Sequence, residues 1–223
     1  MSDIADARNW SIVATVAHIF FEPGTHKRRK NCIFIPYLGR NYRRAFDLND
    51  AIVGDYVPWA QPGIKDFMDD WALIAIGARL DRFGSALKPL THRELVQKVK
   101  ITGPIQGGVS VTGYNSSERK QTVSRKCSLT RLPKRYDGPV RNKLYFTNCD
   151  AKSGASGGAV AALLGDDFYL IGMYSGHYWR SKEPQASGRS PADGAPFHPH
   201  RNANVLRIFD DQMVEAIHEL VAR

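Results

Sequence analysis

Short runs of β-branched and aromatic residues recur along the whole chain, and they constrain the fold more than any other feature. Turn-forming pairs such as Pro62-Gly63, Gly107-Gly108 and Asp137-Gly138 separate many of them. Several short strands divided by frequent turns are typical of a β-barrel or sandwich and disfavour βαβ units. The runs that we expect to be strands are 10–17, 32–38, 51–57, 71–76, 96–101, 109–112, 144–147, 159–164 and 169–174.

One polar stretch interrupts this pattern near the middle of the chain. Residues 81–94 are mixed in character and contain Pro89, so we interpret them as a linker between two all-β halves. The sequence therefore predicts two β domains, at 1–85 and 95–223.

The last part of the chain contains a long loop and a helix. Residues 181–199 are polar and rich in Pro and Gly, which predicts a surface loop. Met213, Ile217 and Leu220 follow helical spacing. The acidic pair Asp210-Asp211 suits the positive end of a helix dipole, so we expect the helix to begin there.

The composition is that of a globular protein with a basic charge balance. Hydrophobic residues make up 43% of the 223 residues and the formal net charge is +9. No apolar run approaches the 18 residues of a membrane span, so no membrane partner is expected. The basic clusters 26–30 and Arg43-Arg44 could neutralise phosphates, but they stand on separate loops. We interpret them as solvated loops and do not expect nucleic acid as a partner.

The chain has three cysteines, Cys32, Cys127 and Cys149, and none of them has the spacing of a zinc site. No metal or cofactor is expected. Cys127 and Cys149 could pair in an oxidising compartment, or all three could stay reduced in a cytosol. The sequence alone leaves both states open.

Three residue types that together perform acyl transfer occur in a defined order. Ser156 stands among glycines in Gly154-Ala155-Ser156-Gly157-Gly158, and His18 and Asp70 precede it inside apolar runs. A serine hydroxyl needs an imidazole to take its proton, and the imidazole needs a carboxylate to orient it. Each residue alone also has a plain interpretation, as a core histidine, a strand cap or a tight turn.

The local contexts resemble those of trypsin-like serine peptidases, the chymotrypsin-fold family. The resembling segments are Val16-Ala17-His18, Asp70-Trp71-Ala72-Leu73 and the glycine-flanked serine motif. Cys149-Asp150 before the motif resembles the bacterial branch near the V8-like glutamyl endopeptidases. The resemblance covers about residues 10–220.

The resemblance implies an all-β fold of two six-stranded-type β-barrels followed by a C-terminal helix. The first barrel would hold His18 and Asp70, and the second would hold Ser156. Family members carry two or three strands before the histidine, whereas residues 1–17 alone precede His18. We therefore expect the first barrel to be incomplete at its N-terminus, because the chain is a fragment or a shortened form of the protein. If the chain is complete, the alternative is an inactive relative.

The resemblance also implies a function, a serine endopeptidase that cleaves protein or peptide substrates through an acyl-enzyme. His18 would be the general base, Asp70 the orienting carboxylate and Ser156 the nucleophile. The N–H groups of Gly154 and Ser156 would form the oxyanion hole. Ala155 replaces the aspartate of trypsin-like zymogens, so activation by a newly cut N-terminus is not expected.

By the same resemblance, substrate binding is assigned to Asp150, Tyr174, Ser175, Gly176 and His177. Asp150 stands where trypsin keeps an aspartate at its pocket floor, which predicts a preference for Arg or Lys at the cleaved position. A structural role beside the neighbouring cysteine is the alternative. Tyr174 replaces the histidine of the glutamyl branch, so glutamyl specificity is not expected.

The resemblance further implies a disulfide between Cys127 and Cys149, with Cys32 apart and buried. A secreted or periplasmic location would supply the oxidant. No secretion signal is visible in residues 1–9.

Two rival functions remain. A catalytically inactive, peptidase-like binding protein could use the same scaffold without turnover. The serine motif also satisfies the G-x-S-x-G elbow of α/β-hydrolases, with Asp193 and His198 or His200 as partners. An esterase of that class would need a helix directly after the serine.

Overall fold

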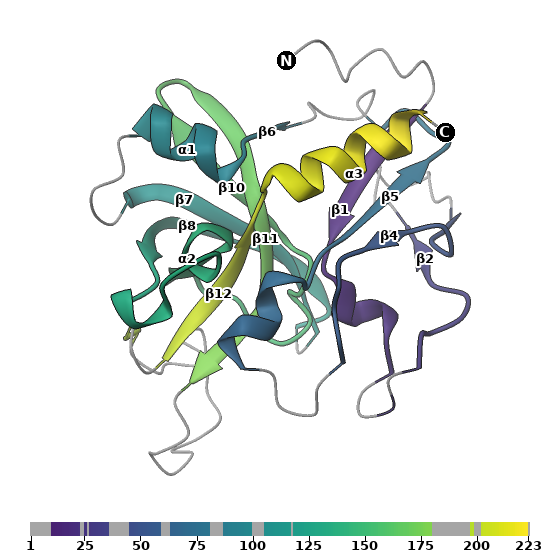
Figure 1. The fold of residues 1–223 in the computed structure, drawn as a ribbon, viewed down its shortest axis with the longest axis horizontal. Coiled ribbons are helices and arrows are strands. Elements are labelled where there is room, and N and C mark those ends of the chain that lie inside the picture. Colours follow the sequence, from purple (N-terminus) through teal and green to yellow (C-terminus); the bar gives the residue numbers. More distant parts are fainter. Residues whose placement is uncertain are drawn as a thin grey trace.

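The computed structural model describes residues 10–22, 25, 27–35, 45–58, 63–80, 87–99, 105–116, 118–179, 197–198 and 202–222. Figure 1 shows a small β-structure from the first part of the chain beside a larger barrel from the second part, with the C-terminal helix lying across the small one. None of the helices in these residues is both long and apolar enough to cross a membrane.

The first structure is a three-stranded antiparallel sheet with an accompanying hairpin. Its strand order is β1-β5-β4, from β1 (Ser11–Thr15), β5 (Ala72–Ile76) and β4 (Ile52–Val53). The hairpin pairs β2 (Ile33–Phe34) with β3 (Phe46–Asp47). Within the described residues these strands do not close into a barrel, which agrees with the expected incomplete first barrel.

The second structure is a closed barrel of six antiparallel strands. They run in the order β10-β7-β8-β9-β12-β11, and a β10–β11 pairing closes the ring. The short strand β6 (Lys88–Pro89) extends the ring by pairing parallel with β11. The barrel strands are β7 (Ile105–Asn115), β8 (Lys120–Arg131), β9 (Leu144–Thr147), β10 (Ala159–Leu164), β11 (Asp167–Trp179) and β12 (Asn202–Ile208).

The barrel forms because alternate side chains of its strands are apolar and point inward. Val109 and Val111 on β7, with Val160 and Ala162 on β10, are almost fully buried in one cluster. Burial of such side chains is the main favourable term in folding, at about 25 cal/mol per Å² of apolar surface. Neighbouring positions face outward, as the period of two requires.

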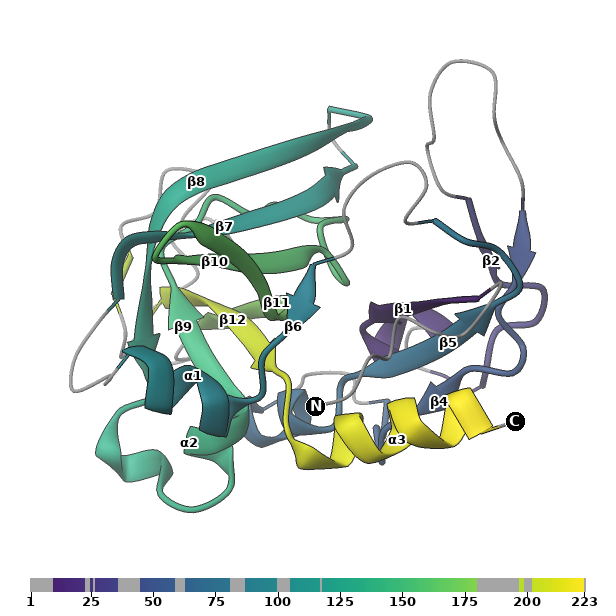
Figure 2. The same cartoon turned by 90° about the horizontal axis from the view of Figure 1, so that it is seen from above.

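The C-terminal helix α3 (Asp211–Ala222) packs the two structures together. Its buried residues contact Trp71 and Leu73 of the first sheet and Met173 of the barrel. Asp210 caps the helix, since its Oδ1 accepts the Met213 N–H at 3.1 Å. Figure 2 shows the helix running beneath the first sheet. The predicted C-terminal helix is confirmed.

One predicted strand is wrong. Residues 96–101 were expected to be extended, but α1 (His92–Val99) covers most of them. The reason is a reciprocal cap, in which the Glu94 N–H donates to Thr91 Oγ1 and the Thr91 N–H donates to Glu94 Oε2. The T-x-x-E pattern that makes this cap is visible in the sequence.

The remaining predictions divide between described and undescribed residues. Of the expected linker 81–94, the first six residues lie outside the described part, and the rest contributes β6 and the start of α1. Most of the expected loop 181–199 also lies outside it. Residues 26 and 43–44 of the basic clusters do as well. The division into domains 1–85 and 95–223 stays a prediction.

Candidate active site

His18 and Asp70 come together at one end of the first sheet. Thr15 ends β1, and His18 follows in the 3-10 helix η2 (Ala17–Phe20). Asp70 lies between the 3-10 helix η3 (Ile64–Met68) and β5. Its Oδ2 lies 2.8 Å from His18 Nδ1, and its Oδ1 accepts the His18 backbone N–H at 2.8 Å. The carboxylate thus holds both the backbone and the ring of the histidine.

Ser175 of β11 brings the barrel to the same carboxylate. Its Oγ donates to Asp70 Oδ2 across 105 residues of sequence. The register between β11 and β12 shifts between Tyr174 and Gly176, so Ser175 is the extra residue of a β-bulge. Asp70 is 1% exposed, and a buried carboxylate needs such hydrogen bonds to remain charged.

The Ser156 motif lies against the end of β1, two to three residues before His18. The Gly157 N–H donates to the Tyr174 carbonyl at 2.9 Å, and the Tyr174 N–H donates to the Gly158 carbonyl at 2.9 Å. Gly157 has φ +80° and its Cα faces Thr15 so closely that a Cβ would collide with the Thr15 hydroxyl. The motif is therefore bonded to β11 on one side and packed on the first sheet on the other.

In the described part of the chain, no hydrogen bond joins His18 to Ser156. Ser156 is half-buried. In enzymes without substrate the contact between nucleophile and base is often long, and it tightens in the substrate complex.

The two predicted oxyanion donors occupy a positive-φ turn. Gly154 has φ +92°, and its Cα packs against Ser116 at the end of the β7–β8 hairpin. Ser116 donates from both its N–H and its Oγ to the Ser153 carbonyl, at 3.1 and 2.7 Å. The Ala155 N–H donates to Lys152, whereas the N–H groups of Gly154 and Ser156 make no hydrogen bond with any described residue. Two donors are thus available near the serine.

The residues assigned to substrate binding are brought together in part. Asp150 is exposed, and its backbone N–H donates to Ser124 Oγ at 2.9 Å. No ion pair to its carboxylate occurs among the described residues. The Tyr174 hydroxyl donates to the Ala151 carbonyl at 3.4 Å, which connects the segment before the serine motif to β11. Gly176 lies against the ring of Phe67.

Asn204 of β12 belongs to this region and sequence reasoning missed it. It is fully buried, and its Nδ2 donates to the Cys149 carbonyl at 2.6 Å. Its Oδ1 lies 3.3 Å from the Tyr174 hydroxyl and 3.1 Å from His177 Nδ1. Because an amide oxygen only accepts, this contact places a proton on His177 Nδ1. An asparagine between apolar neighbours in a barrel strand is the signal that could have identified it.

Tyr56 also lies beside the site without having been predicted. Its ring centroid is 6.5 Å from that of His18. Burial, followed by the negative charges of Asp70 and Asp66, raises the pKa of Tyr56 to about 12. The phenol therefore stays neutral next to the histidine at physiological pH.

The cysteines follow the predicted pairing with one correction. The sulfurs of Cys127 and Cys149 are bonded, with Cα atoms 5.1 Å apart, so the expected neighbours are confirmed. Cys32 is free, as expected, but it is half-buried and not buried. It packs at the edge of the cluster that contains Phe20 and Phe46.

The α/β-hydrolase alternative is wrong. Ser156 is followed by the strand β10 and not by a helix, so no nucleophile elbow forms. Of the partners that it required, Asp193 and His200 lie outside the described residues. Among the described residues, no cluster of three or more His, Cys, Asp or Glu side chains is arranged to hold a metal ion.

Comparisons with known proteins agree with this architecture. No family model and no curated protein sequence matches the chain. Among solved structures, it is similar to a thermostable serine protease, AL20, from an extremophilic microorganism, with a TM-score of 0.56 and 16% identity over 95% of this chain and 85% of that chain. At this identity the likeness shows the fold alone. The protein has a chymotrypsin-like fold, with a closed six-stranded barrel, a second sheet and a C-terminal helix.

Proposed function

We propose that this protein is a serine endopeptidase that hydrolyses peptide bonds through an acyl-enzyme. The observation that carries the proposal is the pair of 2.8 Å contacts between Asp70 and His18, which fix the backbone and the imidazole of the histidine on one carboxylate. The second support is the packing of Gly157 on Thr15, three residues before His18, which brings the serine motif to the end of β1. The likeness to a serine protease fold supports the same class.

In this proposal each group has one task. Ser156 Oγ attacks the peptide carbonyl while His18 Nε2 takes its proton. The Asp70 carboxylate accepts a hydrogen bond from the Nδ1–H group of His18 and stabilises the imidazolium that forms. His18 then protonates the leaving amine. In the second half of the reaction His18 takes a proton from water, the water attacks the acyl-enzyme, and Ser156 regains its proton as the acyl group leaves. No metal or cofactor enters these steps.

The negative charge of the tetrahedral intermediate develops on the former carbonyl oxygen, which would accept hydrogen bonds from the N–H groups of Gly154 and Ser156. Such preorganised donors typically contribute about 10²–10³-fold in turnover. Their orientation depends on the positive φ of Gly154, which a residue with a Cβ reaches only with strain. Ser116 fixes the preceding carbonyl and so supports this turn.

We also propose that Asp150, Tyr174, Ser175, Gly176 and His177 contribute to the binding of the substrate side chain. The Asp150 carboxylate would favour Arg or Lys. Because Asp150 is exposed, the preference is modest, since exposed ion pairs contribute about 0.2–1 kcal/mol, or roughly 1.4- to 5-fold. A strict specificity of the trypsin kind is not expected.

The location and the family branch are proposed on narrower grounds. A Cys127–Cys149 disulfide persists in an oxidising environment, which supports secretion or a periplasmic location. The order Cys149-Asp150 before the serine motif supports a place near the V8-like branch. Tyr174 stands where that branch carries its substrate-binding histidine, so glutamyl specificity is not part of the proposal.

A second candidate is an inactive, peptidase-like binding protein. It is favoured by one observation, that no hydrogen bond joins His18 to Ser156 in the described residues. A binding protein would retain the fold without any turnover.

Hydrolysis of a denatured protein substrate separates the two candidates. We expect cleavage by the wild type, loss of at least about 10³-fold in the Ser156→Ala variant, and full activity in Ser153→Ala. Ser153 is the matched control because it is an exposed serine of the same loop. Full activity in a correctly folded Ser156→Ala variant would contradict the nucleophile assignment, and no cleavage by the wild type would favour the binding protein.

A further inference from the structure

Arg207 is a charged side chain that the proposed mechanism does not use. It lies on β12 and has no exposed surface, which makes it the largest fully buried side chain of the described residues. A buried guanidinium is costly unless its N–H groups are hydrogen-bonded and its charge is paired. Its partners therefore indicate what it does.

These partners lie on both sides of the junction between the barrel and the first half of the chain. On the barrel side, Nη1 donates to the Ile208 carbonyl and Nη2 donates to Asp210 Oδ2 at 2.7 Å. On the other side, Nε donates to the Met68 carbonyl, 139 residues earlier in sequence. The guanidinium thus joins β12 to the end of η3.

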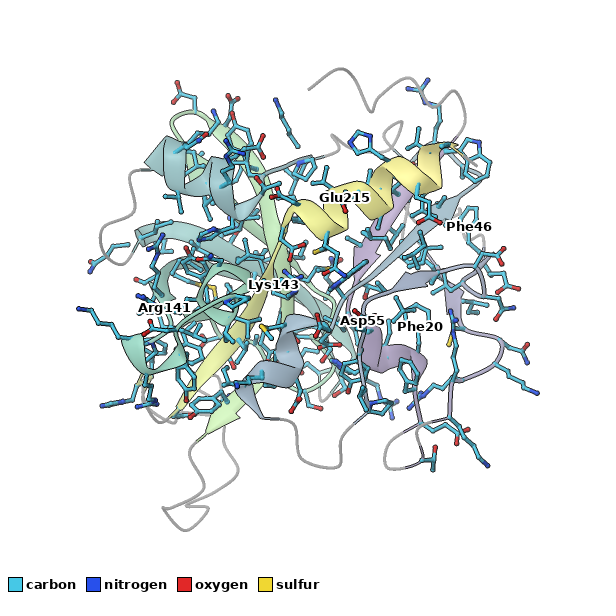
Figure 3. All side chains as sticks on the ribbon, in the orientation of Figure 1. Phe20, Phe46, Asp55, Arg141, Lys143 and Glu215 are labelled. Atoms are coloured by element: carbon cyan, nitrogen blue, oxygen red, sulfur yellow. A yellow bond between two sulfur atoms is a disulfide. The ribbon has the colours of Figure 1, made fainter. Side chains whose placement is uncertain are left out.

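The barrel side of this contact is held by several further contacts. Asp210 is also the cap of α3, through its 3.1 Å contact with the Met213 N–H. Lys143 Nζ adds a second positive charge 3.4 Å from the Asp210 carboxylate. Figure 3 shows Lys143 near the middle of the molecule, close to the start of α3. The anchor of Arg207 therefore consists of a strand, a helix start and a second cation.

The other side of the contact leads directly to Asp70. Met68 is the last residue of η3, and only Asp69 separates it from Asp70. The chain turns tightly here, since the Trp71 N–H donates to the Asp69 carbonyl at 2.9 Å. With the Met68 carbonyl fixed on one side and β5 on the other, little freedom remains for the carboxylate that holds His18.

We propose that Arg207 is a positioning residue of the active site, which fixes the backbone at Met68 and thereby orients the Asp70 carboxylate toward His18. The catalytic consequence rests on the proposed function, but the orientation of Asp70 does not. Lysine would not replace arginine here, because it lacks the planar set of N–H groups that reaches three acceptors at once.

The variant Arg207→Met/Asp210→Asn removes the contact without leaving a fully buried charge unpaired, so it is designed to fold. Lys143 loses Asp210 in this variant but keeps the Asp69 carboxylate 4.0 Å away. Arg207→Lys is the second variant and keeps the charge.

Arg141→Met is the matched control, since Arg141 likewise donates from Nε to a carbonyl, Leu132, and pairs with an acidic residue, Asp137. Figure 3 places Arg141 toward the outer side of the barrel.

The first measurement is kinetic, with an activated ester substrate that keeps weak variants measurable. A misplacement of about 1 Å can reduce turnover by about 10²-fold. We expect kcat to fall by about 10–100-fold in both Arg207 variants, with KM within about threefold, and no change in Arg141→Met. In an Asp70→Asn background the same changes should reduce kcat by less than about twofold, because the group through which Arg207 acts is absent.

The second measurement does not depend on catalysis. In protein labelled with ¹⁵N-histidine, the proton on His18 Nδ1 that is bonded to Asp70 gives a low-field NMR signal. We expect this signal in the wild type and in Arg141→Met, and its loss or broadening in both Arg207 variants. Should the signal persist unchanged in a folded Arg207 variant, or should the loss of kcat be additive with Asp70→Asn, the proposal is overturned. Absence of hydrolysis by the wild type would refute the proposed function and leave the NMR result to decide the role of Arg207.

Discussion

At the scale of single residues, a few close contacts position the serine motif against the first sheet. Gly157 makes one of these contacts. It has a φ of +80°, and it packs so directly on Thr15 that no space is left for a Cβ. A side chain at this position would move Ser156 away from His18. The glycine is thus needed for two separable reasons, its backbone conformation and its lack of a Cβ.

Comparison of two glycine variants separates those reasons. Gly165 also has a positive φ, +68°, but a Cβ there meets nothing within 4 Å. Gly165→Ala should therefore lose only the strain of a left-handed backbone, about 1 kcal/mol of the free energy of unfolding, with unchanged kcat. Gly157→Ala should lose more stability and reduce kcat/KM by at least about 10-fold. Equal effects of both variants would show that the contact with Thr15 is unimportant.

Asp150 tests the proposed substrate preference. The change Asp150→Asn removes the carboxylate and keeps the size of the side chain and the backbone contact to Ser124. We expect the ratio of kcat/KM for Arg over Leu peptides to fall by roughly 1.4- to 5-fold. An unchanged ratio, or a wild-type preference for acidic residues in a peptide library, would end the assignment.

At the scale of elements, Asp210 at the start of α3 makes a contribution to the free energy of unfolding that depends on pH. Although burial acts to raise it, the pKa of Asp210 is lowered from its ordinary value, because the Arg207 charge, the Met213 N–H and Lys143 stabilise its charged form. Since the folded pKa is depressed, the stabilisation is fully present above the ordinary value of about 3.9 and is lost as the pH falls through the folded pKa.

Acid unfolding of an Asp210 variant checks this sign. Asp210→Asn should reduce the free energy of unfolding at pH 7 by about 3 kcal/mol, because it removes the ion-pair partner of the buried Arg207. As the pH falls below about 4, the free energy of unfolding of Asp210→Asn should also change less than that of the wild type. The exposed neighbour Asp211 provides the control, and Asp211→Asn should keep the steeper wild-type dependence. Parallel acid profiles for Asp210→Asn and wild type would contradict the account.

The disulfide links β8 to the loop before the serine motif. Cys127 and Cys149 are separated by 22 residues, and closing a loop of this length stabilises a protein by about 3 kcal/mol in the chain-entropy description. Reduction should therefore lower Tm markedly, whereas Cys32→Ser should not. Thiol counting in denaturant should find one free thiol in the oxidised protein. Three free thiols in protein isolated from an oxidising compartment would exclude the bond.

The elements that sequence reasoning predicted well are those with strong local patterns. Strands β9 and β10 match their predicted bounds because nearly all of their residues are apolar. Strand β8 was missed because most of its side chains are polar, and of its apolar residues Cys127 and Leu129 alone are buried. Helix α1 was not predicted, because β-branched residues such as Val96 favour a strand. The cap formed by Thr91 and Glu94 favours the helix instead.

The order of His18, Asp70 and Ser156, with their local contexts, predicted that these residues form one site, and the structure brings His18 and Asp70 into contact. The role of Ser156 stays a prediction. The contacts that support the site were not predictable, because they join distant segments. Ser175 meets Asp70 across 105 residues, and Arg207 meets Met68 across 139. Such contacts depend on strand register and on one β-bulge, and no local pattern encodes either.

At the scale of the whole molecule, the candidate site lies where the two β structures meet. Asp70 is bonded to His18 of the first half and to Ser175 of the barrel, so one carboxylate connects both. Helix α3 packs on both structures and holds this junction together. The central claim is that the junction activates Ser156 as a nucleophile.

The most direct test is labelling with a fluorophosphonate, followed by peptide mass mapping. The account predicts one label, on Ser156, in the native wild type. It also predicts normal labelling of Ser153→Ala, much slower labelling of Asp70→Asn, and none of Ser156→Ala or of heat-denatured wild type. Absence of label on native wild-type Ser156, or equal labelling of native and denatured protein, would contradict it.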